Sequence, residues 1–122
     1  VIQFAGAHRP LYHYSDGELT EYKGDRKSVG GIPFGKKTEE DFTNHLIETK
    51  KGDKIFMFTD GLTDQLGGPY GRKYSSKRVM DNILNHPGYT MQQLHDLFES
   101  DFASWKQGFR QLDDILMIGI EF

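Results

Sequence analysis

Two groups of aspartates stand beside the two most continuous apolar runs of the chain. Residues 55–58 are four apolar residues without polar alternation, which predicts a strand buried on both faces, and Asp60 stands at its carboxyl end. Residues 115–120 form the second such run, and Asp113 and Asp114 come directly before it. A carboxylate at the end of a buried strand requires a cation or strong hydrogen-bond donors nearby.

The two apolar runs could bring these aspartates to one place. If the runs pair as antiparallel strands, Asp60 and Asp113 lie on the same rim of the sheet, where directly opposed residues are about 4.5–5.5 Å apart. Carboxylates at that distance repel each other unless a cation bridges them. Oxygen ligands without Cys or a His cluster favour Mg²⁺ or Mn²⁺, which can activate water and bind a phosphoryl group. A plainer alternative stays open, in which Asp60 belongs to a turn and Asp113 is a polar lead-in to a strand.

Local patterns predict the elements that position these residues. Residues 1–4 read as a strand, residues 11–23 as a β-hairpin, and residues 42–49 as a weak strand that forms a second hairpin with the central run. Two helices follow, one capped by Ser75 or Ser76 and one opened by Thr90 with Gln93 in a capping box. Strands, a helix pair and a closing strand predict an α+β fold with an antiparallel sheet.

Composition excludes several classes of protein. The 122 residues are enough for one domain, and nine Phe, six Tyr and one Trp supply its core. A net charge of −3 implies no nucleic-acid partner, and no stretch is long enough to cross a membrane. The absence of Cys excludes disulfides and thiolate metal sites and fits a reducing compartment. We therefore expect a cytoplasmic protein without direct membrane contact.

Several motifs, in this order and spacing, resemble the C-terminal half of the SpoIIE-like serine phosphatases, bacterial relatives of the metal-dependent protein phosphatase 2C family. The central one is Phe-Thr-Asp-Gly-Leu-Thr-Asp at residues 58–64, followed later by Asp-Asp-Ile at residues 113–115. The others are the strand and turn at 4–11, the hairpin at 16–19, the Gly-Ile-Pro-Phe-Gly loop at 31–35, the turn at 51–53 and the Gly-rich loop at 65–73.

The resemblance implies a fold and a site. The fold would be half of a phosphatase 2C-like β-sandwich, with a helix pair packed on one face of the sheet. Two Mn²⁺ or Mg²⁺ ions would activate the water that attacks phosphoserine or phosphothreonine. By motif match, Asp60 and Asp113 take the positions of metal ligands, and Asp114 takes a supporting position beside them. Asp64 is either a second supporting residue or a solvated carboxylate of a turn.

One part of the family pattern is missing. The family's earlier motif, an Asp followed by Gly-His-Gly, supplies a bridging carboxylate and does not occur in this sequence. We therefore expect residues 1–122 to be the C-terminal part of a single phosphatase domain, with an incomplete two-metal site and little or no activity alone. Because such a piece has exposed sheet edges, we expect either self-association, for instance as a homodimer, or a reorganised minimal sheet.

The family also implies a biological setting. The expected substrate is an antagonist-type phosphoprotein of a partner-switching cascade that controls sigma factors, with sensor domains upstream that could tether the parent protein to a membrane. One alternative is a non-enzymatic regulatory or binding module with a degenerate phosphatase fold. Another Mg²⁺-dependent phosphotransfer fold would need an Asp-x-Asp after a strand within βαβ units, and neither is found. In the Gly-rich loop, Arg72 or Lys73 would either meet the substrate phosphate or be solvated charges of a connector.

Overall fold

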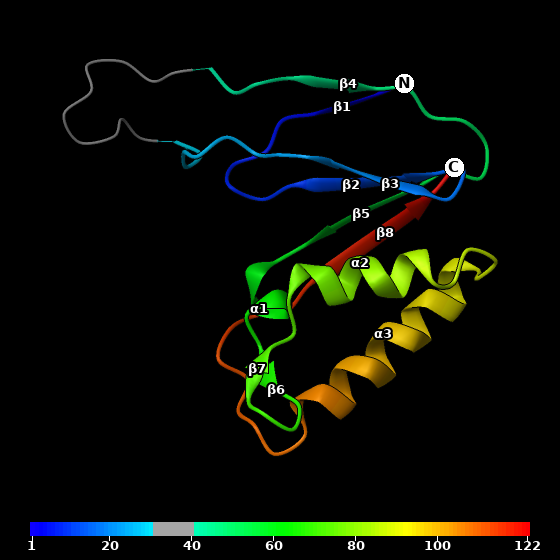
Figure 1. Ribbon diagram of the computed structural model, residues 1–122. Coiled ribbons are helices and arrows are strands. Elements are labelled where there is room, and N and C mark those ends of the chain that lie inside the picture. Colours follow the sequence, from blue (N-terminus) through cyan, green and yellow to red (C-terminus); the bar gives the residue numbers. More distant parts are fainter. Residues whose placement is uncertain (31–40) are drawn as a thin grey trace.

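A four-stranded antiparallel sheet forms the middle layer of the structure (Figure 1). The structure is a computed structural model that describes residues 1–30 and 41–122. The sheet has the order β3-β2-β5-β8, and its strands are β2 (Leu11–Ser15), β3 (Glu18–Tyr22), β5 (Lys54–Phe58) and β8 (Met117–Glu121). The expected motif at residues 31–35 lies outside the described residues.

The other elements cover the two faces of this sheet (Figure 1). A two-stranded sheet of β1 (Ile2–Phe4) and β4 (His45–Ile47) lies over one face, and two helices lie against the other, α2 (Ser76–Leu84) and α3 (Met91–Lys106). Between β5 and α2 come a short helix and a small hairpin, namely α1 (Asp60–Thr63), β6 (Leu66–Gly67) and β7 (Arg72–Lys73). This arrangement confirms the expected α+β class and the helix pair on one face.

Side-chain alternation along the strands explains the two hydrophobic cores. On β5, Phe56 and Phe58 point into the larger core under the helices, whereas Ile55 points into the smaller core under β1 and β4. The helices contribute their apolar stripes to the larger core, among them Val79 and Phe98. The prediction that residues 55–58 form a centrally buried strand is confirmed.

Helix starts and the first hairpin follow local signals. Ser75 accepts a hydrogen bond from the Arg78 N–H at the start of α2, and Thr90 forms the expected capping box with Gln93 at the start of α3. The β2–β3 hairpin turns at residues 16–17, as predicted.

Two predicted strand environments are wrong. The segment at 42–49 does supply β4, but β4 pairs with β1, and the neighbours of β5 are β2 and β8. The closing strand β8 is an edge strand rather than a strand buried on both faces, because nothing in the described chain pairs with its outer side. Ile118 and Ile120 are 42% and 44% exposed there. No helix among the described residues combines the length and apolarity of a membrane span.

A partly buried polar network joins the two helices. The Asp101 carboxylate on α3 accepts hydrogen bonds from the Tyr74 hydroxyl (2.6 Å), from Arg78 Nε and Nη2 (2.9 and 2.6 Å) and from Asn82 (3.0 Å). The Arg78 guanidinium also lies 4.5 Å from the centre of the Trp105 ring. Partial burial alone would raise the pKa of Asp101. The hydrogen bonds that the carboxylate accepts and the charge of Arg78 both lower this pKa and outweigh burial, so it falls to about 2.

Replacing Asp101 with Asn is therefore expected to destabilise the fold in a pH-dependent way. Because the folded pKa of about 2 lies below the ordinary value of 3.8, the carboxylate contributes stability above pH 4 and loses it as the pH falls toward 2. That contribution is about 2 kcal/mol at pH 7 and about 1 kcal/mol less at pH 3. Urea unfolding of wild type and Asp101→Asn at both pH values measures the difference.

The matched control is Glu99→Gln on the same helix, where the side chain is exposed and should change the free energy of unfolding by less than about 0.5 kcal/mol. A difference between wild type and Asp101→Asn that stays constant from pH 7 to pH 3 would contradict a lowered pKa for this carboxyl group.

Candidate functional site

The aspartate-bearing segments meet where the β5–β8 ladder ends. The two strands pair antiparallel, and Phe58 opposite Met117 is the last pair of the ladder. One residue further, the Thr59 backbone N–H donates a hydrogen bond of 2.9 Å to the Leu116 carbonyl oxygen. The predicted antiparallel pairing of the two runs is therefore present, and the chain enters α1 directly beyond it.

Thr59 and Gly61 hold the two segments against each other. The Thr59 hydroxyl donates to the Asp114 carbonyl oxygen at 3.0 Å and accepts from the Leu116 N–H at 3.0 Å. A Cβ on Gly61 would lie 2.1 Å from the Asp114 carbonyl oxygen and 3.3 Å from the Asp113 carbonyl carbon. Only glycine permits so close a backbone approach. These contacts place Asp60 and Asp113 on one rim of the sheet, which we call the acidic rim together with Asp64 and Asp114.

The acidic rim differs from its sequence-based description in two respects. Asp60 is the first residue of α1 and is exposed. Water can therefore solvate its carboxylate, which does not require a cation because of burial. The register does not set Asp60 directly opposite Asp113, because Phe58 pairs with Met117 and neither aspartate belongs to the ladder. The expectation of a buried carboxylate and of directly opposed aspartates is therefore wrong, although the shared rim is correct.

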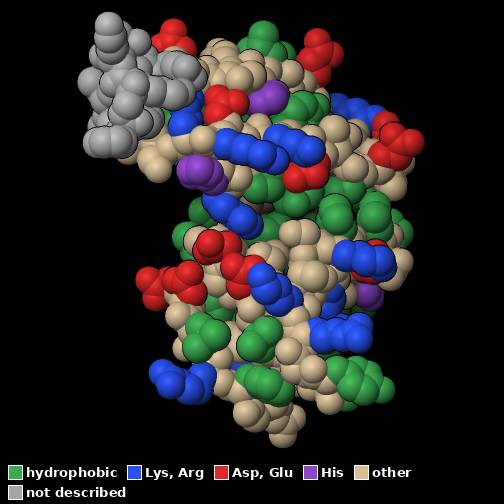
Figure 2. All heavy atoms as spheres, turned by 60° about the vertical axis from the view of Figure 1, so that its left-hand side comes forward, with side chains coloured by type: hydrophobic (Ala, Val, Ile, Leu, Met, Phe, Trp, Pro, Cys, Tyr) green, Lys and Arg blue, Asp and Glu red, His purple; other side chains and the backbone are tan. Residues whose placement is uncertain are grey.

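The four carboxylates have different surroundings. Asp113 accepts a hydrogen bond from the Asp114 N–H at 2.7 Å, and Lys73 lies 3.3 Å from Asp64. Within the described residues, Asp60 and Asp114 form no ion pair through their side chains. Figure 2 shows acidic side chains gathered at mid-height on the face where α1 and the chain after α3 lie, with basic side chains beside them.

These donors fit a hard divalent cation in kind. Carboxylate oxygens are preferred ligands of Mg²⁺ and Mn²⁺, and no Lys or Arg among the described residues neutralises Asp60 or Asp113. Such ions take about six ligands. Two carboxylates therefore supply part of a coordination sphere, and water or other residues would supply the rest.

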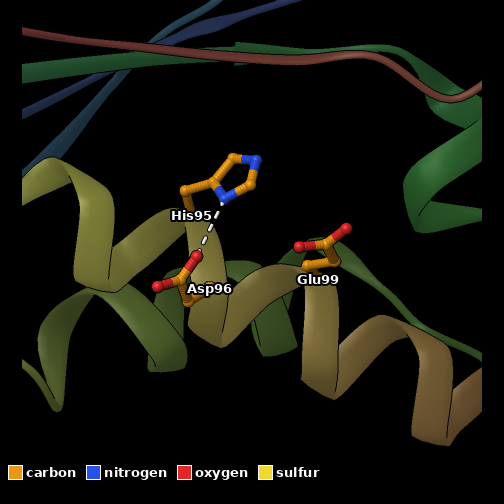
Figure 3. A group of neighbouring side chains, drawn as sticks. All are labelled: His95, Asp96 and Glu99. Carbon is orange, nitrogen blue, oxygen red and sulfur yellow. Dashed lines mark hydrogen bonds and ion pairs between the residues drawn. The ribbon is translucent and has the colours of Figure 1, made fainter.

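A second group of possible ligands lies on α3. His95, Asp96 and Glu99 are the described residues that place three ligand atoms within 4.8 Å of one another, and all three are exposed. Figure 3 shows His95 and Glu99 directed toward the strands, whereas Asp96 is turned aside and contacts His95 at 3.2 Å. Their spacing along one helix accounts for the proximity. Clusters of exposed acidic groups are common on proteins that bind no metal there, so we assign this cluster no function.

Three features of the site escaped sequence reasoning. Nothing in the sequence pattern indicates that Thr59 bridges to residues 114–116, or that Lys73 pairs with Asp64. A glycine directly after a strand predicts a sharp turn, whereas in the structure Gly61 permits close approach of the backbone to Asp114. The one available signal is the Thr-Asp-Gly sequence at residues 59–61, directly after the central apolar run.

Comparison with known proteins places this chain among phosphatase domains. The family model described as Stage II sporulation protein E (SpoIIE) matches residues 2–122. No curated protein sequence matches the chain. Among solved structures, the SiaA-PP2C domain of Pseudomonas aeruginosa aligns with a TM-score of 0.84 and 30% sequence identity, covering 98% of this chain and 46% of that one.

A more distant structure shares the fold. The phosphatase domain of the cell fate determinant SpoIIE from Bacillus subtilis aligns with a TM-score of 0.54 and 12% identity, covering 94% of this chain and 48% of that one. The chain thus spans about half the length of each of these two solved chains.

Proposed function

The chain belongs to the Stage II sporulation protein E family, and on this premise we propose that the protein containing it is a metal-dependent phosphatase of phosphoserine or phosphothreonine proteins. Residues 1–122 would form the C-terminal part of its single phosphatase domain. The observation that carries the proposal is the acidic rim, where Asp60 and Asp113 come together from two segments that lie more than 50 residues apart in the sequence.

Within this proposal each aspartate has a role. Asp60 and Asp113 would hold Mn²⁺ or Mg²⁺, which when bound lowers the pKa of a water molecule and offsets the charge of a phosphoryl group. Asp64 and Asp114 would orient the ligands through hydrogen bonds rather than bind the ion directly. Lys73 forms an exposed ion pair of 3.3 Å with Asp64.

Thr59 and Gly61 would position the ligands without touching the substrate. Both hydrogen bonds of the Thr59 hydroxyl end on residues 114–116, so this side chain links the start of α1 to the segment that carries Asp113. The missing Cβ of Gly61 keeps that distance short. A site of this kind depends on such support because displacements of about 1 Å can cost about 100-fold in rate.

The proposed substrate is an antagonist-type phosphoprotein of a partner-switching cascade that controls sigma factors. Sensor domains upstream in the parent protein would regulate the phosphatase. Support for a phosphoprotein substrate comes from the phosphatase domains to which the chain is similar.

The complete protein should release phosphate from a phosphoserine peptide only when Mn²⁺ or Mg²⁺ is present. Chelation with EDTA is expected to remove the activity, and added Mn²⁺ should restore it, because the activated water depends on the ion. Phosphate release measured with and without the chelator tests this directly.

Residues 1–122 alone serve as the comparison in the same assay. They should turn over little or nothing, since two carboxylates are an incomplete set of ligands. Hydrolysis by the complete protein that is indifferent to chelation would contradict the metal-dependent mechanism. A complete protein without activity on any phosphoserine peptide would favour the non-enzymatic binding module instead.

A further inference from the structure

An exposed aromatic and basic surface lies next to the acidic rim. It consists of the β6–β7 hairpin and the chain directly after α3, and we call it the hairpin patch: Tyr70, Arg72, Lys73, Phe109 and Arg110. Tyr70 at the hairpin tip is 82% exposed, and Phe109 is 39% exposed. A Cβ on Gly71 would lie 3.4 Å from the Phe109 ring, so the tip of the hairpin and the chain after α3 are in contact.

The hairpin is held firmly against α3 by Trp105. The Gly68 N–H donates to the Trp105 carbonyl oxygen at 2.9 Å, and the Trp105 indole N–H donates to the Arg72 carbonyl oxygen at 3.2 Å. A Cβ on Gly67 would lie 1.9 Å from the Trp105 carbonyl oxygen, so the two backbones touch. An exposed Tyr on a fixed hairpin offers contact area with little loss of conformational entropy on binding.

The charge of the hairpin patch is opposite to that of the adjacent acidic rim. Arg72, Lys73 and Arg110 are all exposed, and of these only Lys73 has an ion pair within the described residues, with Asp64. The Arg72 guanidinium lies 5.7 Å from the centre of the Tyr70 ring, where it remains open to solvent. Figure 2 shows basic and hydrophobic side chains at the lower end of the face, below the acidic group.

The hairpin patch is also connected directly to the aspartate segments. The Gln65 side-chain amide, which is buried, donates to the Arg110 carbonyl oxygen at 2.9 Å, and the Gln111 side-chain amide donates to the Asp113 carbonyl oxygen at 3.1 Å. The hairpin patch and the segment that carries Asp113 are therefore neighbours, joined through residues 110–113.

We propose that the hairpin patch binds an acidic segment that flanks the phosphorylated serine of the substrate protein. This inference rests on the proposed phosphatase function and adds to it a sequence preference. Charge complementarity carries it, because Arg72 and Arg110 present cations without an ion-pair partner among the described residues, next to two exposed aromatic rings. A nucleic acid is the less favoured occupant, because the chain as a whole carries a net charge of −3.

The test compares two phosphoserine peptides as substrates of the complete protein. One carries Asp and Glu beside the phosphoserine, and the other carries Ala and Gln. The kcat/KM of the wild-type protein should be about tenfold higher for the acidic peptide than for the neutral one. Arg72→Glu and Arg110→Glu should each lower this ratio about threefold, and the double variant should lower it about tenfold. The matched control is Lys51→Glu, an exposed charge in the turn at the other end of β5, which should leave the ratio unchanged.

Two further measurements keep the inference separate from the proposed function. If neither peptide is hydrolysed, the phosphatase proposal fails, and fluorescence anisotropy of the labelled acidic peptide still tests docking through a roughly tenfold weaker Kd in the double variant. If Arg72→Glu disturbs the hairpin, Arg110→Glu remains informative, because its side chain contacts no described residue through hydrogen bonds or ion pairs. An unchanged ratio and unchanged Kd in the double variant would overturn the proposal. Equal binding of a single-stranded oligonucleotide that the same substitutions abolish would overturn it as well.

Discussion

Replacing Asp60 or Asp113 with Asn in the complete protein is expected to reduce Mn²⁺-dependent hydrolysis of a phosphoserine peptide by about 1000-fold or more. Asn keeps the shape of the side chain but loses the negative charge that a hard divalent cation requires. Effects of this size are common when one preorganised charge is removed from an active site. Because Asp60 is exposed and makes no ion pair with another described residue, the fold should survive its replacement.

The measurement is kcat/KM at saturating Mn²⁺, together with a circular dichroism melt of each variant. Asp96→Asn is the matched control, since Asp96 belongs to the other group of close ligand atoms on α3. Its activity should stay within about twofold of wild type. An Asp60→Asn or Asp113→Asn variant that keeps full activity would refute the assignment of the acidic rim as the site, and loss of activity in Asp96→Asn would direct attention to α3.

Gly61→Ala is expected to damage both stability and activity although it changes no charge. The new Cβ would lie 2.1 Å from the Asp114 carbonyl oxygen, so the backbone of one segment must move. Overpacking of this kind costs about 3 kcal/mol. A displacement of about 1 Å should also lower kcat by about 100-fold, because the segments that carry Asp60 and Asp113 would shift relative to each other.

Gly88→Ala separates the effect of close approach from the general effect of losing a glycine. A Cβ at Gly88 would meet no atom within 4 Å, so this variant should behave like wild type in urea unfolding and in phosphate release. Unfolding of Gly61→Ala at the same urea concentration as Gly88→Ala, together with retained activity, would contradict the positioning role of Gly61.

The elements that sequence reasoning predicted correctly are those with local signals. The capping box of Thr90 and Gln93, the Ser75 cap and the turn at residues 16–17 each involve residues within four positions of one another. The unbroken apolar run at 55–58 likewise identified the central strand, because a strand covered on both faces needs no polar alternation.

The predictions that were wrong concern contacts between parts of the chain that are distant in sequence. The ragged pattern of residues 42–49 indicates a strand but carries no information on its partner, which is β1 rather than the adjacent β5. The apolar run at 115–120 was expected to be fully buried, yet Ile118 and Ile120 are partly exposed on the edge strand β8. Apolar composition alone does not show whether a neighbouring strand is present to cover such a run.

The candidate site was predictable in location and not in detail. Antiparallel pairing of two apolar runs was enough to bring Asp60 and Asp113 to one rim. The hydrogen bonds of Thr59, the contact of Gly61 with Asp114 and the exposure of Asp60 depend on how the chain leaves the ladder, which no short-range pattern specifies. The network around Asp101 was missed for the same reason, because its donors lie about 20 residues away or more.

The central claim is that the acidic rim binds a divalent cation, and paramagnetic broadening by Mn²⁺ tests it most directly. In a titration of the ¹⁵N-labelled chain, the amide signals of residues 59–61 and 113–115 should broaden at the lowest Mn²⁺ concentrations, and this broadening should disappear in the Asp60→Asn and Asp113→Asn double variant. Weak binding is sufficient for this effect to appear. First broadening at residues 95–99, with residues 59–61 and 113–115 unaffected, would contradict the account.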